Sequence, residues 1–173
     1  MSKGGSTMRM IALLASAAAL ALHAQGARAE MPPAVAAPGA TVVLTVRAEG
    51  AQIYECKAAD DGKLAWAFRE PIATLILGGT TVGRHYAGPV WEHVDGSSVH
   101  AKAVGTAPGA SGNDIAWLKL EVVDRHGSGT LAGVDFVQRI NTSGGVLRGA
   151  CEQAGSLRAA PYSADYVFLH KGG

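Results

Sequence analysis

The stretch Val90–Ala103 reads VWEHVDGSSVHAKA and decides the fold class. Its two arms, Val90–Val94 and Ser98–Ala103, flank Asp95-Gly96, and an Asp-Gly pair between two such segments is a strong signal for an antiparallel β-hairpin. A turn centred on Gly96-Ser97 would place His93 opposite His100, whereas a turn centred on Asp95-Gly96 would place Trp91 opposite His100. The sequence leaves both registers open.

Short apolar segments separated by Gly, Pro and Asp continue on both sides of this hairpin. After Thr41, no segment of ten or more residues has an apolar repeat of about 3.6 residues, so we expect no long helix. About nine strands spaced by roughly 8–12 residues instead predict one all-β domain over residues 42–173, an antiparallel sandwich or barrel. The other strand candidates are Thr41–Arg47, Ala51–Lys57, Leu64–Arg69, Ile72–Leu77, Val82–Tyr86, Ile115–Val123, Val134–Asn141 and Ala164–Leu169.

The N-terminal residues have the pattern of a secretory signal peptide. Lys3 and Arg9 precede the apolar run Met10–Leu22, and Ala27-Arg28-Ala29 offers small residues to a signal peptidase. The run is shorter than the roughly 20 residues that a membrane span needs. We therefore predict a cleaved signal helix over residues 1–29, export to the periplasm or the extracellular space, and no stable membrane insertion after cleavage; a buried helix or a membrane anchor is the alternative. Residues 30–41, EMPPAVAAPGAT, are predicted to be an extended Pro/Ala-rich tether.

Charge and cysteine content narrow the possible partners. The whole chain carries a net charge of +1 and contains no run of Lys or Arg. Loss of Lys3, Arg9 and Arg28 with the leader lowers the basic count from 15 to 12 against 14 acidic residues, a net charge of −2, so nucleic acid is not an expected partner. Cys56 and Cys151 are predicted to form a disulfide, because an exported protein enters an oxidising compartment; two buried thiols are the alternative.

No catalytic motif of known mechanism occurs in the chain. The patterns of serine hydrolases, P-loop nucleotide-binding proteins, zinc proteases and dinucleotide-binding proteins are all missing, so no cofactor is expected. The densest polar and aromatic stretch is Gly83–Val99, GRHYAGPVWEHVDGSSV, followed by His100. Our first hypothesis is non-enzymatic binding of a small molecule, a glycan or an envelope partner. The candidate ligand-binding residues are His85, Trp91, Glu92, Asp95 and Arg139.

Two other readings stay open. The first is a hydrolase or metal-dependent enzyme that uses His85 with Glu92 or Asp95, or a metal held by His93 and His100 with Glu92 or His85 as a third ligand. Strand alternation places Glu92 on the opposite face from His93, which disfavours their sharing a metal. The second is a structural envelope module. Under this structural reading, His85 holds a loop in place through a hydrogen bond, Trp91 is a core residue and Arg139 forms an internal ion pair with Asp135.

Several motifs together resemble a known family. They are Gln52–Cys56 (QIYEC), Gly83–Glu92 (GRHYAGPVWE), Gln138-Arg139 with Thr142–Gly145 (TSGG), and Cys151. In this order they are similar to the domain-of-unknown-function family 3455 of exported bacterial and secreted fungal proteins, from about Val42 to Leu169. Ala116 and Val146-Leu147 depart from the Pro and the Ala-Pro expected there, which changes backbone stiffness and no reactive group. The resemblance implies a secreted single domain with a disulfide and lends no activity.

Overall fold

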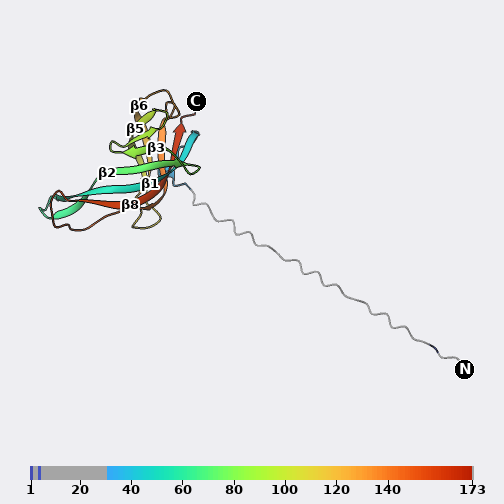
Figure 1. Ribbon diagram of the computed structural model, residues 1–173, viewed down its shortest axis with the longest axis horizontal. Coiled ribbons are helices and arrows are strands. Elements are labelled where there is room, and N and C mark those ends of the chain that lie inside the picture. The colour runs from blue at the N-terminus through green and yellow to red at the C-terminus, as the bar shows by residue number, and fades with distance from the viewer. Residues whose placement is uncertain (2–3, 5–30, 173) are drawn as a thin grey trace. The chain divides into compact units, whose positions relative to one another are not determined.

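The computed structural model describes Met1, Gly4 and residues 31–172, so the predicted signal peptide and its cleavage point fall almost entirely outside the described residues. Eight antiparallel strands form one closed barrel in which each strand pairs with its neighbours in chain order and β8 pairs back onto β1 (Figure 1). The prediction of an all-β barrel is therefore confirmed. The strands are β1 Thr41–Ala58, β2 Leu64–Leu77, β3 Thr80–Tyr86, β4 Val90–His93, β5 Ser98–Ala107, β6 Trp117–His126, β7 Phe136–Gly144 and β8 Leu157–His170.

The ten strand candidates, expected to give about nine strands, form eight because two expected breaks are not breaks. β1 runs straight through Gly50, where a Cβ atom would lie 2.0 Å from the carbonyl oxygen of Ile72, so this glycine allows a close approach of two strands and makes no turn. β2 runs through Pro71. That proline lies near a bulge in β1 and before Ala73, the first residue paired to β3, the kind of edge position at which a strand tolerates proline.

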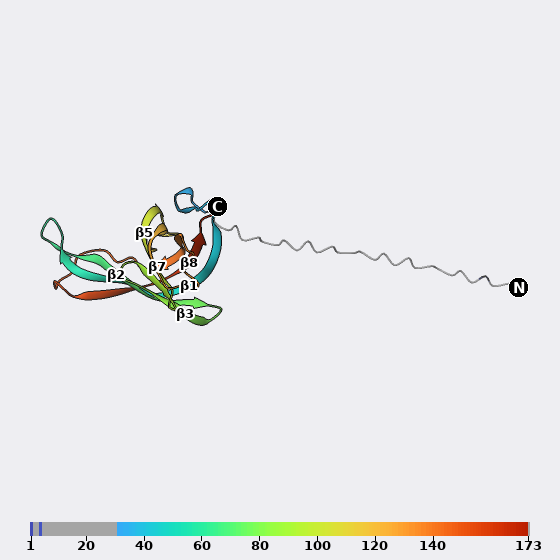
Figure 2. The same cartoon turned by 90° about the horizontal axis from the view of Figure 1, so that it is seen from above.

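Three strands continue beyond the barrel as an arm, which we define as residues 51–58 of β1, 64–72 of β2 and 157–161 of β8 (Figure 2). The predicted disulfide is confirmed, and it fastens this arm. Cys56 is bonded to Cys151 in the loop between β7 and β8, with 5.9 Å between their Cα atoms. The Trp66 amide donates to the carbonyl of Gly149 at 3.1 Å, so the same loop also pairs with the edge of β2.

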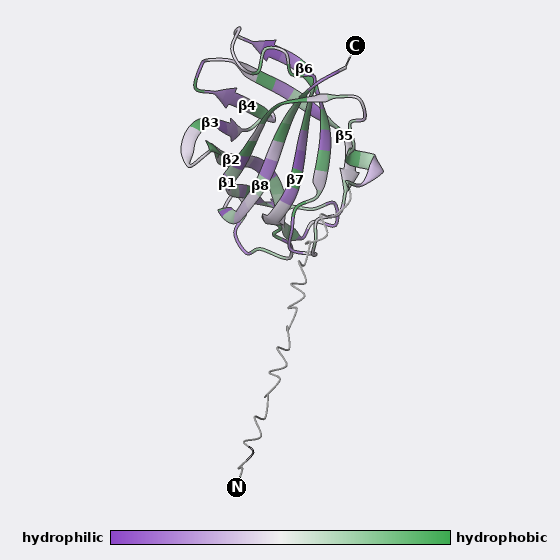
Figure 3. Cartoon of the chain, turned by 90° about the vertical axis from the view of Figure 1, so that its right-hand side faces the viewer, coloured by the Kyte–Doolittle hydropathy of each residue, from purple (hydrophilic) through white to green (hydrophobic). Residues whose placement is uncertain are grey.

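The core fills the barrel interior. Apolar and polar residues alternate along the strands, as the colours of Figure 3 show, because successive side chains point to opposite faces of a sheet. Within the described residues no helix has the length and apolar character needed to cross a membrane. The largest fully buried core side chains are Trp91, Tyr166, Phe168, Leu75 and Leu131.

The segment predicted to be a tether is packed against the barrel, so that expectation is wrong for residues 33–35. Pro33–Val35 forms a 3-10 turn, η1, and Val35 is completely buried. The Gln138 side chain donates Nε2–H to the carbonyl of Val35 at 2.6 Å, and a Cβ atom on Gly105 would lie 1.9 Å from the carbonyl oxygen of Ala34. Burial of Val35 and the hydrogen bond to a buried glutamine stabilise this docked conformation.

The hairpin adopts neither predicted register. Trp91 pairs with Val99 and Val90 pairs with His100, so the connection is wider than a two-residue turn. The backbone amide of His93 donates to the carbonyl of Ser97 at 2.9 Å. Asp95 holds this wider loop because its carboxylate accepts hydrogen bonds from the amide and the hydroxyl of Ser97, a local bond pattern that competes with a tight turn.

Candidate functional site

A cavity of about 280 Å³ lies where the arm leaves the barrel. The arm, the β3–β4 turn and the interior faces of five barrel strands all contribute to it, so residues far apart in the sequence meet there. Its lining residues are Gln52, Phe68, Arg69, Pro71, His85, Ala87, Gly88, Pro89, Trp91, Leu118, Leu120, Arg139 and Tyr166.

His85 and Trp91 form the aromatic wall of this cavity. They are directly opposed on β3 and β4, and their rings stack with 4.3 Å between centroids and 9° between planes. Tyr166 meets both rings edge-on, with its centroid 5.1 Å from that of His85 and 5.3 Å from that of Trp91. Side chains of directly opposed residues on antiparallel strands lie close together, which brings the two rings into contact. The packing of the rings holds both side chains in one orientation.

His85 is a neutral base in this environment. Its Nδ1 lies 2.9 Å from the carbonyl oxygen of Val90, and because a carbonyl only accepts, Nδ1 carries the proton. Burial lowers the pKa of His85 to about 4, the bond to Val90 opposes this, and the charge of Arg139 lowers the pKa further. A general acid or base working near neutral pH needs a pKa closer to 7. The stacking on Trp91 and the hydrogen bond to Val90, together with this lowered pKa, favour a positioning role for the ring.

Two residues of the lining each have a buried hydrogen-bond donor with no partner within the described chain. Gln52 is 3 % exposed and Trp91 is 1 % exposed, and neither Gln52 Nε2 nor Trp91 Nε1 has an acceptor in reach. Trp117 Nε1 shares this property but does not line the cavity. Because buried polar groups are nearly always hydrogen-bonded, two such atoms around one cavity require an explanation.

Arg139 is the charged residue that β7 brings to the cavity. Its Nε–H donates to the carbonyl of Ala116 at 3.0 Å, which fixes the guanidinium. The expected ion pair with Asp135 is wrong: Asp135 binds Arg125 at 2.7 Å and His170 at 2.9 Å. Asp135 lies directly before the first residue of β7, where Arg125 and His170 already take up its carboxylate. Among the described residues no carboxylate lies within ion-pair distance of Arg139.

Glu92, predicted to share a ligand with Trp91, does not line the cavity. As strand alternation requires, it lies on the other face of β4. Its carboxylate accepts hydrogen bonds from Arg84 at 2.9 Å and from the hydroxyl of Tyr86 at 2.9 Å. The hydrogen bonds from Arg84 and then Tyr86 lower the pKa of Glu92. The Glu92 carboxylate is thus bound to Arg84 and Tyr86 on the outer face of β4.

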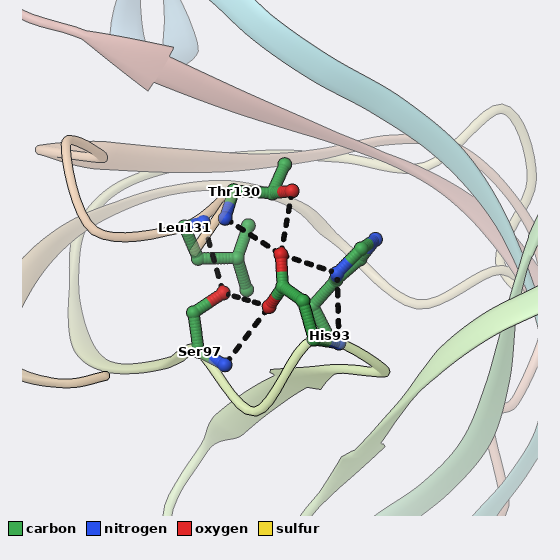
Figure 4. A network of polar contacts seen from close by, with 5 residues as sticks. His93, Ser97, Thr130 and Leu131 are labelled. Carbon is green, nitrogen blue, oxygen red and sulfur yellow. Dashed lines mark hydrogen bonds and ion pairs between the residues drawn. The ribbon is translucent and has the colours of Figure 1, made fainter. Parts of the chain in front are cut away.

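Asp95 does not line the cavity either, and its hydrogen bonds join two loops. Figure 4 labels Ser97, Thr130 and Leu131 of this network. Its Oδ1 accepts from the Ser97 amide and hydroxyl, and its Oδ2 accepts from the amide and hydroxyl of Thr130, both at 2.7 Å. Ser97 Oγ in turn accepts from the Leu131 amide at 3.1 Å. The Ser97 hydroxyl and then the Thr130 amide hold the pKa of Asp95 far below its usual range. The residue ties the β4–β5 loop to the β6–β7 loop.

The structure does not bring together the weak metal candidates His93 and His100. His93 Nδ1 lies 3.0 Å from Asp95 Oδ2, whereas His100 Nε2 lies 2.6 Å from the carbonyl oxygen of Gly88. They are not cross-strand partners, because the hairpin pairs His100 with Val90. In the part of the chain that the structure describes, no group of three or more His, Cys, Asp or Glu residues could hold a metal ion.

Of the predicted ligand-binding residues, His85, Trp91 and Arg139 meet in the cavity. Sequence reasoning missed Gln52 and Tyr166. Gln52 occupies the inward phase of β1, in line with buried Ala48 and Tyr54, and a polar residue in an otherwise apolar inward row is the signal that could have identified it.

Gly145, the last residue of the TSGG motif, lies close to Gln52. Gly145 has φ +88°, and a Cβ atom there would lie 3.1 Å from Gln52 Cγ and 2.9 Å from Tyr162 Cβ. A side chain at this position would press on the glutamine, so the motif has a physical link to the cavity.

Comparison with known proteins gave one finding. A family model described as "Protein of unknown function (DUF3455)" matches residues 36–170, in agreement with the resemblance found in the sequence. No curated protein and no solved structure matches the chain.

Proposed function

We propose, for a chain that belongs to the DUF3455 family of proteins of unknown function, that it is an exported binding protein. Its ligand is one small molecule held in the cavity between the barrel and the arm. The disulfide between Cys56 and Cys151 and the predicted signal peptide support the exported location, because structural disulfides persist in oxidising compartments.

The observation that carries this proposal is that two residues lining one cavity, Gln52 and Trp91, each hold a buried donor without a partner, Nε2 and Nε1 respectively. An unsatisfied buried donor costs about 1–3 kcal/mol of stability, and a ligand acceptor would recover that cost. A few polar groups among mainly apolar side chains is the usual composition of a small-molecule site. The cavity of about 280 Å³ suits a metabolite-sized ligand better than a glycan chain or a protein segment.

Binding explains more of this site than catalysis does. The acids that would assist His85 in a hydrolase, Glu92 and Asp95, are bonded to other groups outside the cavity. A purely structural role for the stretch accounts for Asp95 and Glu92 but leaves the two orphan donors and Arg139 without a purpose.

The test is a screen of small metabolites, including neutral sugars, by thermal shift and calorimetry on the purified protein. We expect bound compounds to raise the melting temperature and Trp91→Phe to weaken their affinity at least tenfold, because phenylalanine keeps the stacking but lacks the N–H donor. Trp117→Phe is the matched control, since it removes a buried indole N–H outside the cavity. A screen without a binder, or affinities that Trp91→Phe leaves unchanged, would contradict the proposal.

A further inference from the structure

We infer that the ligand is a small organic carboxylate whose anionic head lies beside Arg139, Trp91 and Gln52 and whose apolar body lies against Leu118 and Leu120. The inference rests on the proposed function and adds the chemical class of the ligand.

The side chains that line the cavity carry positive charge. The charged members of the lining are Arg69 and Arg139, and no Asp or Glu of the described chain lines the cavity. Arg69 already has a counter-charge, because its Nε lies 3.1 Å from Glu70 Oε1. Arg139 has none within the described residues, although its guanidinium is anchored on Ala116 and partly buried. A partly buried cation gains most from a ligand that brings the missing negative charge.

Three side chains of the lining, those of Arg139, Trp91 and Gln52, carry hydrogen-bond donors. An arginine guanidinium and an indole N–H can only donate, and the Gln52 amide offers further donors. The three side chains come from β7, β4 and β1 and line one cavity. A carboxylate presents two acceptor oxygens, which suits a planar guanidinium with additional single donors beside it, and such charge-assisted bonds are roughly twice as strong as neutral ones.

The remaining lining selects the body of the ligand. Leu118 and Leu120 contribute from β6, Pro71 from β2 and Pro89 from the β3–β4 turn, and Phe68 on the arm is 55 % exposed. A fully polar anion such as inorganic phosphate would leave these apolar surfaces without a partner. The ligand therefore combines one anionic head with a compact apolar or aromatic body.

The experiment uses three probes with the same body and different heads: 3-phenylpropionate, 3-phenylpropionamide and 3-phenylpropylammonium. Calorimetry on the purified protein is expected to show the carboxylate bound at least tenfold more tightly than the amide, and the ammonium bound most weakly. Arg139→Gln is expected to bring the carboxylate and the amide within threefold of each other. Arg69→Gln is the matched control, because that arginine is already paired with Glu70 and should leave the ratio unchanged.

A second variant guards against misfolding. Arg139→Lys retains the charge without the planar fork, so it should keep a carboxylate preference that is smaller than that of the wild type. Near-ultraviolet circular dichroism of each variant checks the aromatic packing around Trp91.

The outcomes separate this inference from the proposed function. If the amide or the ammonium binds as tightly as the carboxylate, or if the compounds found in the wider screen are mainly neutral or cationic, the carboxylate inference is overturned while binding in the cavity stands. If neither the probes nor any compound of the screen binds, the proposed function itself fails.

Discussion

The folded structure favours the neutral form of the His85 side chain. His85 is 2 % exposed, stacks on Trp91 and donates Nδ1–H to Val90. The charge of Arg139 on β7 acts on it, and the ring of Tyr166 on β8 meets it edge-on with 5.1 Å between centroids. A proton on the ring would therefore be both desolvated and close to a cation, which explains why burial, with a smaller contribution from Arg139, lowers its pKa to about 4.

This lowered pKa predicts a pH dependence of stability. The unfolded chain gains a proton on His85 below about pH 6.5, whereas the folded chain gains it only near pH 4. The free energy of unfolding should thus fall as pH drops from about 6.5 toward 4, by up to about 3 kcal/mol from this residue. Denaturant unfolding of wild type and His85→Gln over this range tests it.

The variant should lose stability less steeply with acidification than the wild type, and the exposed His126→Gln, as control, should keep the wild-type slope. Equal slopes in wild type and His85→Gln would show that the ring takes up its proton in the folded state as readily as in the unfolded one.

At the scale of single residues, the structure brings some of the predicted site residues to one cavity and places others on a different face. Residue type and local pattern make His85, Trp91 and Arg139 candidates, and the barrel brings them together. Glu92 was grouped with Trp91 because they are adjacent, yet adjacent strand residues point to opposite faces. Local pattern does not reveal that Gln52 meets Trp91 and Arg139, because β1 is not a sheet neighbour of β4 or β7 and only the closed barrel lets the three strands line one cavity.

The strands themselves were predictable, and their continuity was not. Alternation identified segments of all eight strands, but the rule that Gly and Pro interrupt a strand split β1 at Gly50 and β2 at Pro71. The rule failed because Gly50 allows a close approach of two strands and Pro71 lies near a bulge, so neither residue ends its strand. The register of the β4–β5 hairpin was missed for a similar reason, since the side chain of Asp95 sets the loop length by binding Ser97 and Thr130.

If Gly50 is needed for the close approach of β1 and β2, Gly50→Ala should be costly. The added methyl would lie 2.0 Å from the carbonyl oxygen of Ile72 and 2.6 Å from the Cα of Ala73, both backbone atoms that cannot rotate away. Overpacking of this kind costs about 1–3 kcal/mol of unfolding free energy. Gly133→Ala, whose new methyl meets nothing within 4 Å, should change it by less than about 0.5 kcal/mol in the same denaturant titration. Equal stability of the two variants would refute this reading of Gly50.

Taken as a whole, the molecule joins a closed barrel to a less enclosed arm, and the cavity uses both. Closure leaves the barrel strands without free edges, whereas the arm has only three paired strands and depends on additional restraints. The arm contributes Gln52, Phe68 and Arg69 to the lining, so its position relative to β4 and β7 sets the shape of the site. The disulfide is the covalent restraint on this arrangement, because it joins the arm at Cys56 to the β7–β8 loop at Cys151.

Removing the disulfide should therefore affect both stability and binding. The bond closes a loop of 95 residues, for which chain entropy in the unfolded state gives about 4–5 kcal/mol. The double variant Cys56→Ser/Cys151→Ser should lose about 4–5 kcal/mol of unfolding free energy and therefore unfold at a lower denaturant concentration. Any ligand found in the screen should bind the variant more weakly, because Gln52 is less firmly placed. Wild type in reductant should approach the variant, while the variant itself, as the internal control, should not respond to reductant. A variant as stable as the oxidised wild type would mean that strand pairing alone holds the arm, and unchanged ligand affinity would mean that the arm only borders the site.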